Sequence, residues 1–374
     1  MSITVGLRLE PLDVLFFRDG RPFTPASRGK SELPMPQTLA GAIWTAVLQQ
    51  QGCDFAALRR LVCQEKRSLA DSLRDLCGAD WLASLHVRGP WFARGRDGQM
   101  EVLVPVPAVL QRAKSLPRAG PLLFRLSPRR REQLPGWAQS LLPDQRDLWP
   151  LWHQRPGASE PASGFLTREG LRSFLAEGEV SPDEVVQDAD VYAFDHRTGI
   201  GIHADRLAAQ EGLLYGASFL ALKPDVVLYA EVVALRSEEA ELLQKIRLLA
   251  LGGEGRRVCV SPLPQPYDWG AIERPLANRQ EKPLALLTTP ALLASRWKPD
   301  LAATQVLAAA VPGHVAVSGW DLARGGPKPA RFAAPAGSVY YFDKNPETWP
   351  AALSTDPEDQ RQGWGCYLRG VWNG

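Results

Sequence analysis

Alternation of apolar and polar residues predicts most of the strands in this chain. Residues 3–10 (ITVGLRLE) alternate in this way and predict a β-strand close to the start. The apolar run of residues 13–17 (DVLFF) leads to a turn at Asp19-Gly20. Residues 91–110 are a predicted hairpin, because an Asp-Gly pair separates two strand-like runs. Further strands are predicted at residues 226–235, 256–264, 283–289, 315–320 and 337–343.

Apolar residues spaced three and four positions apart predict fewer helices than strands. One helix is predicted over residues 38–50, where the Thr38 side chain can cap the N–H groups of the first turn. Residues 54–85 place leucines on one face and are predicted to be helical, as is the short segment 166–178. A further helix is predicted over residues 237–253, from a serine cap to a glycine pair.

The order of these elements predicts an α+β fold with two related units. Each half runs from a strand through helices to more strands, unlike the regular alternation of a doubly wound parallel sheet. A chain of 374 residues also exceeds the usual size of one domain. We expect domains of 1–190 and 191–374, with a long insertion at about 112–165. A structureless loop of that length is typical of a functional segment.

Basic residues are concentrated in the first part of the chain. The net charge is only +2, yet residues 1–150 hold 21 Lys and Arg against 14 Asp and Glu. Arginine accounts for 34 of the 43 basic residues, and its planar fork donates two parallel hydrogen bonds to a phosphate. Contact with a polyanion is one explanation, and GC-rich codon usage is the other. Trp137, Trp149 and Trp152 stand among arginines of the insertion, where they can stack on bases or fill a core.

The motifs of common enzyme and metal-binding classes are missing from the sequence. The five cysteines are an odd number without CxxC spacing, so we expect reduced thiols, no disulfide framework and no metal site. No GxxxxGK[ST], GxSxG or HExxH pattern occurs. The cluster GGEGRR at 252–257 follows a predicted helix and precedes a predicted strand, the reverse of the order in nucleotide-binding folds. No cofactor is therefore expected.

Two segments carry chemistry that suits a polyanion. The glycines of residues 252–257 expose backbone N–H groups, and Arg256 and Arg257 can pair with phosphates. The alternative is a helix-capping turn with two solvated arginines. His196 and His203 share a segment, HRTGIGIH, that is predicted to be a glycine-rich loop. A histidine in such a loop can be the general base in RNA cleavage by the RNA's own 2′-hydroxyl. RNA contact or loop packing are the alternatives for these histidines.

A series of blocks in the sequence resembles one known family. Residues 10–23 (EPLDVLFFRDGRPF) and 33–48 (LPMPQTLAGAIWTAVL) are similar to the third subunit of the Cmr complex, a type III-B CRISPR-Cas effector. This subunit is a RAMP-superfamily protein close to the Cas-five group. Later blocks match in the same order: HRTGIGI (196–202), EGLLYGASF (211–219), LGGEGRRV (251–258), SGWDLARGGPKP (318–329) and PAGSVYYF (335–342). The series spans nearly the whole chain, although Trp44 stands where related proteins often have an arginine.

This resemblance implies a fold and a role. The fold would be two ferredoxin-like (RRM-like, βαββαβ) units packed together, with long loop insertions. The role would be non-catalytic, in antiviral defence by RNA-guided RNA targeting. The subunit would hold the repeat-derived 5′ tag of the CRISPR RNA. It would dock on the large Cas-ten-type subunit with its Palm domains and on the backbone RAMP subunit, and it would meet target RNA only indirectly.

Candidate RNA contacts are the basic and glycine residues of the matched blocks. They are Arg18, Arg21, Arg28 and Lys30 before the first predicted helix, Gln37 and Thr38 at its start, His196 and Arg197, then Gly252, Gly253, Gly255, Arg256 and Arg257, and Lys328. The N–H groups at a helix start suit a phosphate. For Arg18 and Arg21 the alternative is an internal salt bridge with Asp13 or Asp19.

Other function classes stay open on the sequence. They are a metal-independent RAMP endoribonuclease that processes precursor CRISPR RNA, an enzyme acting on a small molecule, and a subunit that only bridges proteins. No apolar run reaches the roughly 18–20 residues of a membrane helix, and the N-terminus lacks the pattern of a secretory signal. We therefore expect a cytoplasmic protein without membrane contact.

Overall fold

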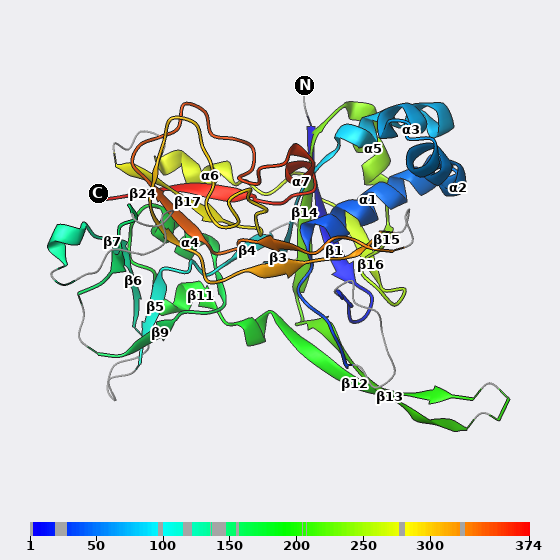
Figure 1. Cartoon of the computed structure of the whole chain (residues 1–374), viewed down its shortest axis with the longest axis horizontal. Coiled ribbons are helices and arrows are strands. Elements are labelled where there is room, and N and C mark those ends of the chain that lie inside the picture. Colours follow the sequence, from blue (N-terminus) through cyan, green and yellow to red (C-terminus); the bar gives the residue numbers. More distant parts are fainter. Residues whose placement is uncertain are drawn as a thin grey trace.

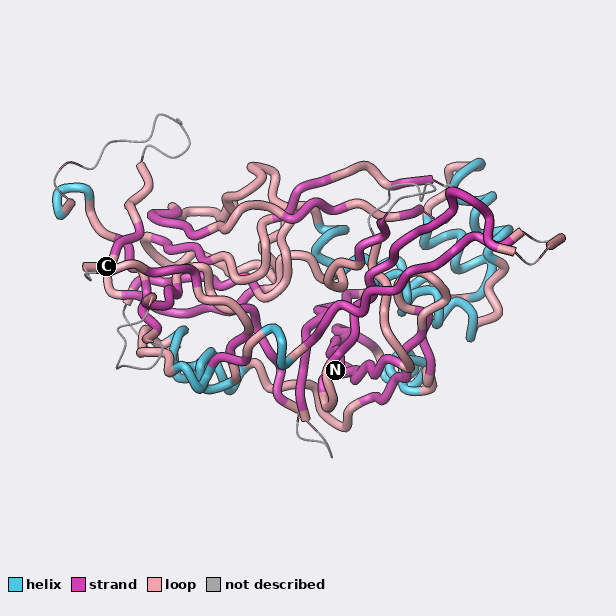
Figure 2. The backbone as a smooth tube through the Cα atoms, turned by 90° about the horizontal axis from the view of Figure 1, so that it is seen from below, coloured by secondary structure: helices cyan, strands magenta, loops and turns pink. Residues whose placement is uncertain are grey.

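The molecule is a mixed α+β protein drawn out along one axis (Figure 1). The structure is a computed structural model, and it describes residues 3–18, 28–95, 100–114, 122–134, 136, 147–154, 157–203, 205–206, 208–276, 281–321 and 326–374. Helices gather mainly at one end, while strands run through the centre (Figure 2). The prediction of an α+β fold is confirmed. No helix in the described ranges is long and apolar enough to cross a membrane.

An eight-stranded antiparallel sheet forms the centre of the molecule. Its order is β11 (Val185–Val186), β10 (Phe165–Leu166), β4 (Glu101–Pro105), β3 (His86–Arg94), β14 (Val226–Leu235), β1 (Ile3–Pro11), β16 (Arg257–Pro262) and β15 (Leu248–Ala250). β1 lies between β14 and β16, with Leu7 opposite Ala230 and Leu9 opposite Val260. Val5, Leu7 and Leu9 are buried, as their alternation predicts.

This sheet joins segments from both sides of residue 190. β1, β3 and β4 precede that residue, whereas β14, β15 and β16 follow it. The ladder hydrogen bonds of β1 are made to β14 on one side and to β16 on the other. The expected boundary at residue 190 therefore does not coincide with a division of the sheet.

One end of this sheet is covered by helices. They are α1 (Pro36–Gln50), α2 (Phe55–Arg59), the π-helical turn η1 (Arg60–Gln64), α3 (Leu69–Cys77), the 3-10 turn η2 (Asp80–Ser84) and α5 (Ser237–Gln244). Leu39, Ile43 and Val47 of α1 recur every four residues and are fully buried. They share one core with Leu7 and Leu9 of β1. The helical prediction for residues 54–85 is confirmed, apart from short breaks.

The start of α1 differs from the prediction. The helix begins at Pro36 after Met35, and Thr38 lies inside the first turn rather than at the cap. The Thr38 N–H donates to the Met35 carbonyl at 3.0 Å. Proline fits the first helical position because its ring presets φ and the missing N–H has no helical partner there. Thr38 is therefore not the helix cap.

The segment 237–253 is not one helix, contrary to the prediction. α5 ends at Gln244, and Leu248–Ala250 forms β15 beside β16. Leu249 is buried while Leu248 is exposed, which is the alternation of an edge strand. Ser237 is also not the cap, since the Arg236 N–H donates to the Glu239 carboxylate at 2.9 Å.

A second antiparallel sheet is built from the C-terminal part of the chain. Its order is β18 (Val306–Ala310), β23 (Val339–Phe342), β17 (Lys282–Leu287) and β24 (Tyr367–Trp372). Leu284, Tyr341 and Leu368 of this sheet share a core with Trp91 and Tyr229 of the first. The two sheets are therefore packed together. Smaller elements around them are α4 (Arg168–Leu175), α6 (Gly270–Glu273), α7 (Pro357–Arg361), β19 (Val315–Val317), β20 (Trp320–Asp321), β21 (Gly326–Pro327) and β22 (Arg331–Ala333).

A long hairpin projects from the body at one end (Figure 1). β12 (Tyr192–Ile202) pairs antiparallel with β13 (Ala209–Leu222), and β2 (Arg28–Lys30) adds to β13 in parallel. The segment HRTGIGIH was expected as a loop, yet residues 196–202 lie on β12. Glycines hide the strand periodicity of this segment, because they lack a side chain that would mark one face.

The insertion expected at 112–165 contains short strands. β5 (Leu110–Ala113) pairs with β6 (Leu123–Arg125) and β9 (Ser159–Pro161), and β7 (Ser127–Pro128) pairs with β8 (Leu151–Trp152). The Trp149 N–H donates to the Leu307 carbonyl at 2.7 Å, which attaches this segment to β18. The part that the structure describes is therefore folded onto the body. Trp137 lies outside the described residues.

Candidate nucleic-acid interface

Three segments far apart in sequence meet at the base of the β12–β13 hairpin. Leu15 forms a bridge with Leu220 of β13. The Gly253 N–H donates to the Phe16 carbonyl at 2.7 Å, and the Leu12 N–H donates to the Arg257 carbonyl at 3.1 Å. Residues 12–17, the turn 252–257 and the hairpin base together are called the hairpin-base surface below.

Charged residues of these three segments form one network. Arg256 Nη1 lies 2.7 Å from Asp13 Oδ2, and Arg197 Nη2 lies 3.8 Å from Asp13 Oδ1. Arg197 Nε also donates to Asp195 Oδ2 at 2.8 Å. The Val14 backbone N–H, foremost, and then the two arginines hold the pKa of Asp13 below its usual value. Asp13 is therefore a carboxylate that partly neutralises two guanidinium groups.

A buried aromatic ring supports the same two arginines. The guanidinium carbon lies 4.7 Å from the Phe219 ring centroid for Arg256 and 5.0 Å for Arg197. Phe219 packs in turn on Phe16, with ring centroids 5.0 Å apart. The two guanidiniums cover this ring, whose residue is only 7% exposed, so it is not a platform for a base. The ring instead holds the two guanidinium groups in place beside Asp13.

The glycine-rich segment 252–257 is the turn between β15 and β16. Leu251 and Arg256 close it, since the Leu251 N–H donates to the Arg256 carbonyl at 3.0 Å. Gly252 has φ of +85°, and a Cβ there would lie 2.5 Å from the Phe16 carbonyl oxygen. Only glycine fits that approach. The alternative of a helix-capping turn is wrong, because α5 has already ended at Gln244.

The remaining predicted contacts near the hairpin have varied surroundings. Lys30 is exposed, with its Nζ 6.0 Å from the Phe194 ring centroid, and His196 is exposed opposite Ser218. Arg257 is exposed and Arg18 is half-buried. The Arg28 backbone pairs with Gly216 on β13, whereas its side chain and all of Arg21 and Asp19 lie outside the described residues. Asp13 pairs with Arg256 and Arg197, so it has partners that the sequence did not indicate.

Gln37, Thr38 and Lys328 belong to a different place. Gln37 Nε2 donates to the Ser318 carbonyl at 2.7 Å, and the Lys328 N–H donates to the Gly319 carbonyl at 2.7 Å. The Gln37 side chain thus fixes the segment that leads to Lys328. Since the Thr38 N–H bonds to Met35, the predicted phosphate contact through that N–H is wrong.

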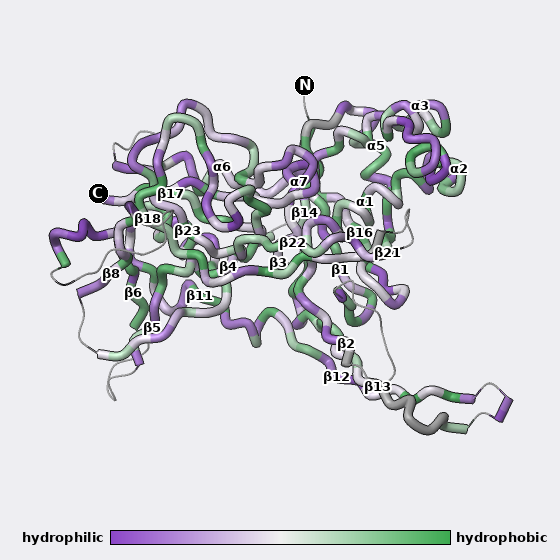
Figure 3. Tube along the Cα trace, viewed as in Figure 1, coloured by the Kyte–Doolittle hydropathy of each residue, from purple (hydrophilic) through white to green (hydrophobic). Residues whose placement is uncertain are grey.

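Sequence reasoning missed Asp195 and Phe219 of the hairpin-base surface, and it considered Asp13 only as a partner of Arg18 or Arg21. Asp13 and Phe219 belong to the quoted blocks, yet neither residue type signals RNA binding. Their roles depend on the pairing of β12 with β13, which places Asp195 opposite Phe219. In the described residues no group of three or more His, Cys, Asp or Glu could hold a metal ion. Polar and apolar positions are mixed along the hairpin (Figure 3).

A family model of CRISPR-associated proteins matches residues 7–372 of this α+β chain, so the chain is of the CRISPR-associated class. The chain belongs to the family described as CRISPR-associated protein (Cas_Cmr3). The resemblance to the third subunit of the type III-B Cmr complex is thereby confirmed, and the chain is a component of that effector. No curated protein matches it in sequence.

The solved structures that this chain matches include chains of a Cmr-beta complex and of a Csm1-Csm4 cassette. One is a chain of the type III-B Cmr-beta complex bound to cognate target RNA and AMPPnP, at 15% identity, covering 90% of this chain and 86% of that chain, with a TM-score of 0.49. Another is a chain of the Csm1-Csm4 cassette in complex with cA4, at 13% identity, covering 99% and 96%, with a TM-score of 0.36.

Proposed function

We propose that this chain is a non-catalytic subunit that grips the repeat-derived 5′ tag of the CRISPR RNA at the hairpin-base surface. The observation that carries the proposal is the pair of guanidiniums of Arg197 and Arg256 above Phe219. Both arginines keep part of their surface in solvent, with 43% and 22% of the side chain exposed. A phosphate can therefore reach them without unfolding the site.

The chemistry of these groups favours the RNA backbone over the bases. A guanidinium held on an aromatic ring loses little freedom when it binds phosphate, and its fork matches two phosphate oxygens. The turn at residues 252–257 lets a strand approach closely at Gly255, where even an added Cβ would meet nothing within 4 Å. Lys30, His196 and Arg257 are exposed on the adjoining strands and add further donors. These features support a clamp on a few phosphates.

The strand orders support the finer form of the fold, two βαββαβ units. In such a unit the fourth strand lies beside the first, followed by the third and the second. The order β16-β1-β14-β3 follows that rule with α1 and α5 as the connecting helices. The order β24-β17-β23-β18 follows it too, with α7 before its last strand and with no helix at residues 288–305. We propose that the first unit is interrupted by residues 95–225 and that the second occupies residues 282–372. This division replaces the boundary at residue 190.

Docking on the large Palm-domain subunit and on the backbone RAMP subunit is part of the same proposal. Membership of the family supports it, because a Cmr component acts within a complex. Target RNA is then met indirectly, through its pairing with the guide. The tag held here would fix one end of that guide.

Fluorescence titration of the full chain with labelled tag RNA tests the proposal, both alone and with the large subunit. A scrambled tag is the control RNA. We expect selective binding without cleavage, and a slope of log affinity against log salt of about −0.7 per phosphate contacted, or roughly −3 for four. Arg197→Ala and Arg256→Ala each reduce the magnitude of that slope by about 0.7. Arg67→Ala, an ion-paired arginine of the helical end, is the control variant.

The same titration contains the outcomes that contradict the proposal. The tag-binding role would be contradicted if the scrambled tag bound with equal affinity and if Arg256→Ala had the same affinity for tag RNA as Arg67→Ala. RNA cleavage that disappears in His196→Ala or His203→Ala would identify a processing ribonuclease instead. Subunit association without RNA binding, alone or together, would identify a subunit that only bridges proteins.

A further inference from the structure

A second basic surface lies at the opposite end of the long axis from the β12–β13 hairpin (Figures 1 and 3). It is formed by β7, β8 and the residues beside them, and it is called the β7–β8 surface. Its residues are Arg129, Arg130, Arg131, Trp149, Trp152 and Lys282. The proposed tag site uses none of them.

Main-chain bonds fix this surface to the body of the protein. The Arg129 N–H donates to the Pro150 carbonyl at 2.9 Å, next to the ladder between β7 and β8. The Trp149 N–H donates to the Leu307 carbonyl at 2.7 Å, and Leu307 belongs to β18 of the second sheet. The arginines are therefore presented from a fixed backbone, which lowers the entropy that binding must remove.

Two cations share one indole ring at the centre of this surface. The Arg130 guanidinium carbon lies 5.3 Å from the Trp149 ring centroid, and Lys282 Nζ lies 5.2 Å from it. Lys282 Nζ is also 5.2 Å from the ring of Trp372, which meets Trp149 edge to face. Three segments far apart in sequence thus bring positive charge to one aromatic cluster.

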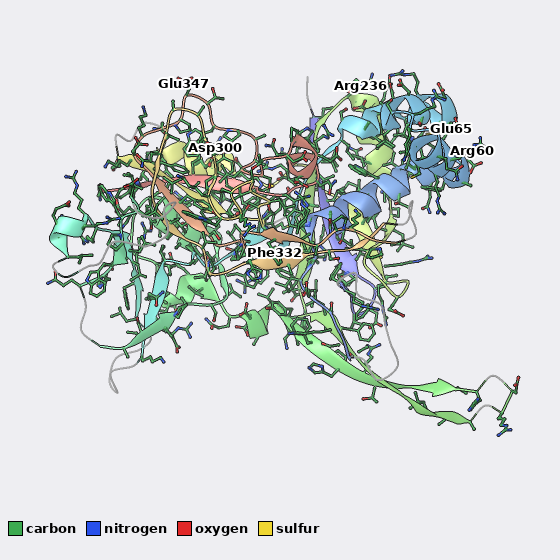
Figure 4. All side chains as sticks on the ribbon, in the orientation of Figure 1. Arg60, Glu65, Arg236, Asp300, Phe332 and Glu347 are labelled. Carbon is green, nitrogen blue, oxygen red and sulfur yellow. The ribbon has the colours of Figure 1, made fainter. Side chains whose placement is uncertain are left out.

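These cations differ from the ion-paired arginines at the helical end of the molecule. Within the described ranges, no carboxylate forms an ion pair with Arg129, Arg130, Arg131 or Lys282. At the helical end, by contrast, Arg60 pairs with Glu65 at 3.4 Å (Figure 4). Arg67 pairs with Asp75 at 2.6 Å. Arg129 and Arg130 are both exposed. Their charge is therefore available to an external anion.

We propose that the β7–β8 surface is a second, sequence-independent binding site for single-stranded RNA. Arg129 and Arg130 contact the phosphates, and Trp152 on the adjacent strand stacks on a base. Trp152 is 45% exposed, one of the larger exposed fractions among the apolar residues. Trp152 pairs with Ser127, two residues before Arg129, so the paired strands carry guanidiniums and an exposed tryptophan a few residues apart. Such a combination suits the alternation of phosphate and base along a single strand. An acidic protein partner would use the charges but would not need the indole.

Binding of a fluorescein-labelled oligouridylate to the full chain tests this site. The probe does not contain the tag sequence. Its binding to the β7–β8 surface therefore does not depend on whether the hairpin-base surface selects the tag. We expect Arg129→Gln/Arg130→Gln to reduce the magnitude of the salt slope by about 1.4, which corresponds to two phosphates at about 0.7 each. Trp152→Ala weakens binding about tenfold through loss of stacking. A 4-thiouridine version of the probe crosslinks to the peptide that contains Trp152.

The matched control removes the same charge elsewhere. Arg60→Gln/Arg67→Gln lies on the helical end and should leave both the affinity and the slope unchanged. Equal effects of the two double variants, or no crosslink within residues 122–154, would overturn the proposal. Retention of oligouridylate binding with loss of assembly with the large subunit would show that the surface binds protein. Thermal unfolding of each variant verifies that the chain is folded. If the double variant does not fold, the affinity of Trp152→Ala for oligouridylate tests the proposal by itself.

Discussion

A single residue, Asp13, sets the charge balance of the hairpin-base surface. Its carboxylate lies beside Arg256 and Arg197, the two arginines proposed to meet the tag. A phosphate that binds these guanidiniums must compete with this carboxylate. Asp13 is 55% exposed, so solvent screens the contacts and each is weak. The residue therefore limits affinity more than it stabilises the fold.

The first prediction concerns Asp13→Asn. Loss of the carboxylate should raise the affinity for tag RNA up to about fivefold, the equivalent of about 1 kcal/mol for an exposed pair, and most strongly at low salt. Because the pKa of Asp13 is lowered, the wild-type group stays ionised at every pH above about 4. The ratio of the two affinities should therefore be constant from about pH 5 to 8. Titrations at several pH values measure it.

Asp195→Asn is the matched control for this variant. Asp195 contacts Arg197 but not Arg256 in the described contacts, so its loss should raise the affinity less. A decrease in affinity on Asp13→Asn would contradict the prediction. It would mean that the carboxylate orients the arginines rather than competing with the phosphate.

At the scale of single helices and strands, the sequence predicts some elements correctly, and each wrong prediction has a physical cause. Thr167 was in a segment predicted to be helical, and its side chain caps α4 as local chemistry requires. The prediction fails at Leu248–Ala250, because a run of leucines satisfies a helical and a strand pattern equally. It fails again at residues 196–202, because glycines remove the periodic signal. Pairing with β16 and β13 decides both cases, and that pairing is not local.

The 252–257 turn gives a prediction at the scale of the element. A Cβ on Gly252 would lie 2.5 Å from the Phe16 carbonyl, and φ there is +85°. Gly252→Ala should lower the free energy of unfolding by about 2 kcal/mol or more, of which about 1 kcal/mol is the left-handed backbone. Gly255→Ala has the same sign of φ in open space, so it should cost only about 1 kcal/mol. Urea unfolding compares the two. Equal losses would show that the contact with Phe16 does not position the turn.

At the scale of the whole molecule, pairing between distant segments organises both sheets and both surfaces. Ile3 pairs with Leu235, and Leu9 pairs with Val260. No local pattern encodes such partners, which explains why the sequence predicted a division at residue 190. The matched blocks nonetheless included most of the hairpin-base surface, since Arg197, Gly253 and Arg256 do come together. Gln37 and Lys328 meet each other elsewhere, around Ser318.

A buried polar network connects the first sheet to the segment before the second. Glu231 on β14 is 1% exposed and accepts hydrogen bonds from the Tyr229 hydroxyl and from Trp269 Nε1, each at 2.8 Å. Arg88 Nη1 on β3 lies 3.0 Å from the second carboxylate oxygen of Glu231. Burial lowers the pKa of Arg88, yet Cys366 and Glu231 outweigh it and hold that pKa above its usual value. Arg88 therefore stays charged within the fold.

This network predicts that the Glu231 carboxylate stabilises the first sheet and its contact with the segment around Trp269. Glu231→Leu leaves the Arg88 cation without its partner and should lower the free energy of unfolding by about 3 kcal/mol or more. In the double variant Arg88→Met/Glu231→Leu both charges are gone, so much of that loss should be recovered. Urea unfolding followed by tryptophan fluorescence measures both, because Trp91 and Trp269 flank the site. The exposed Glu238→Gln is the control, with a change below about 0.5 kcal/mol. If the double variant is as unstable as Glu231→Leu, the hydrogen bonds of Glu231 with Tyr229 and Trp269, rather than the ion pair, account for the stabilisation.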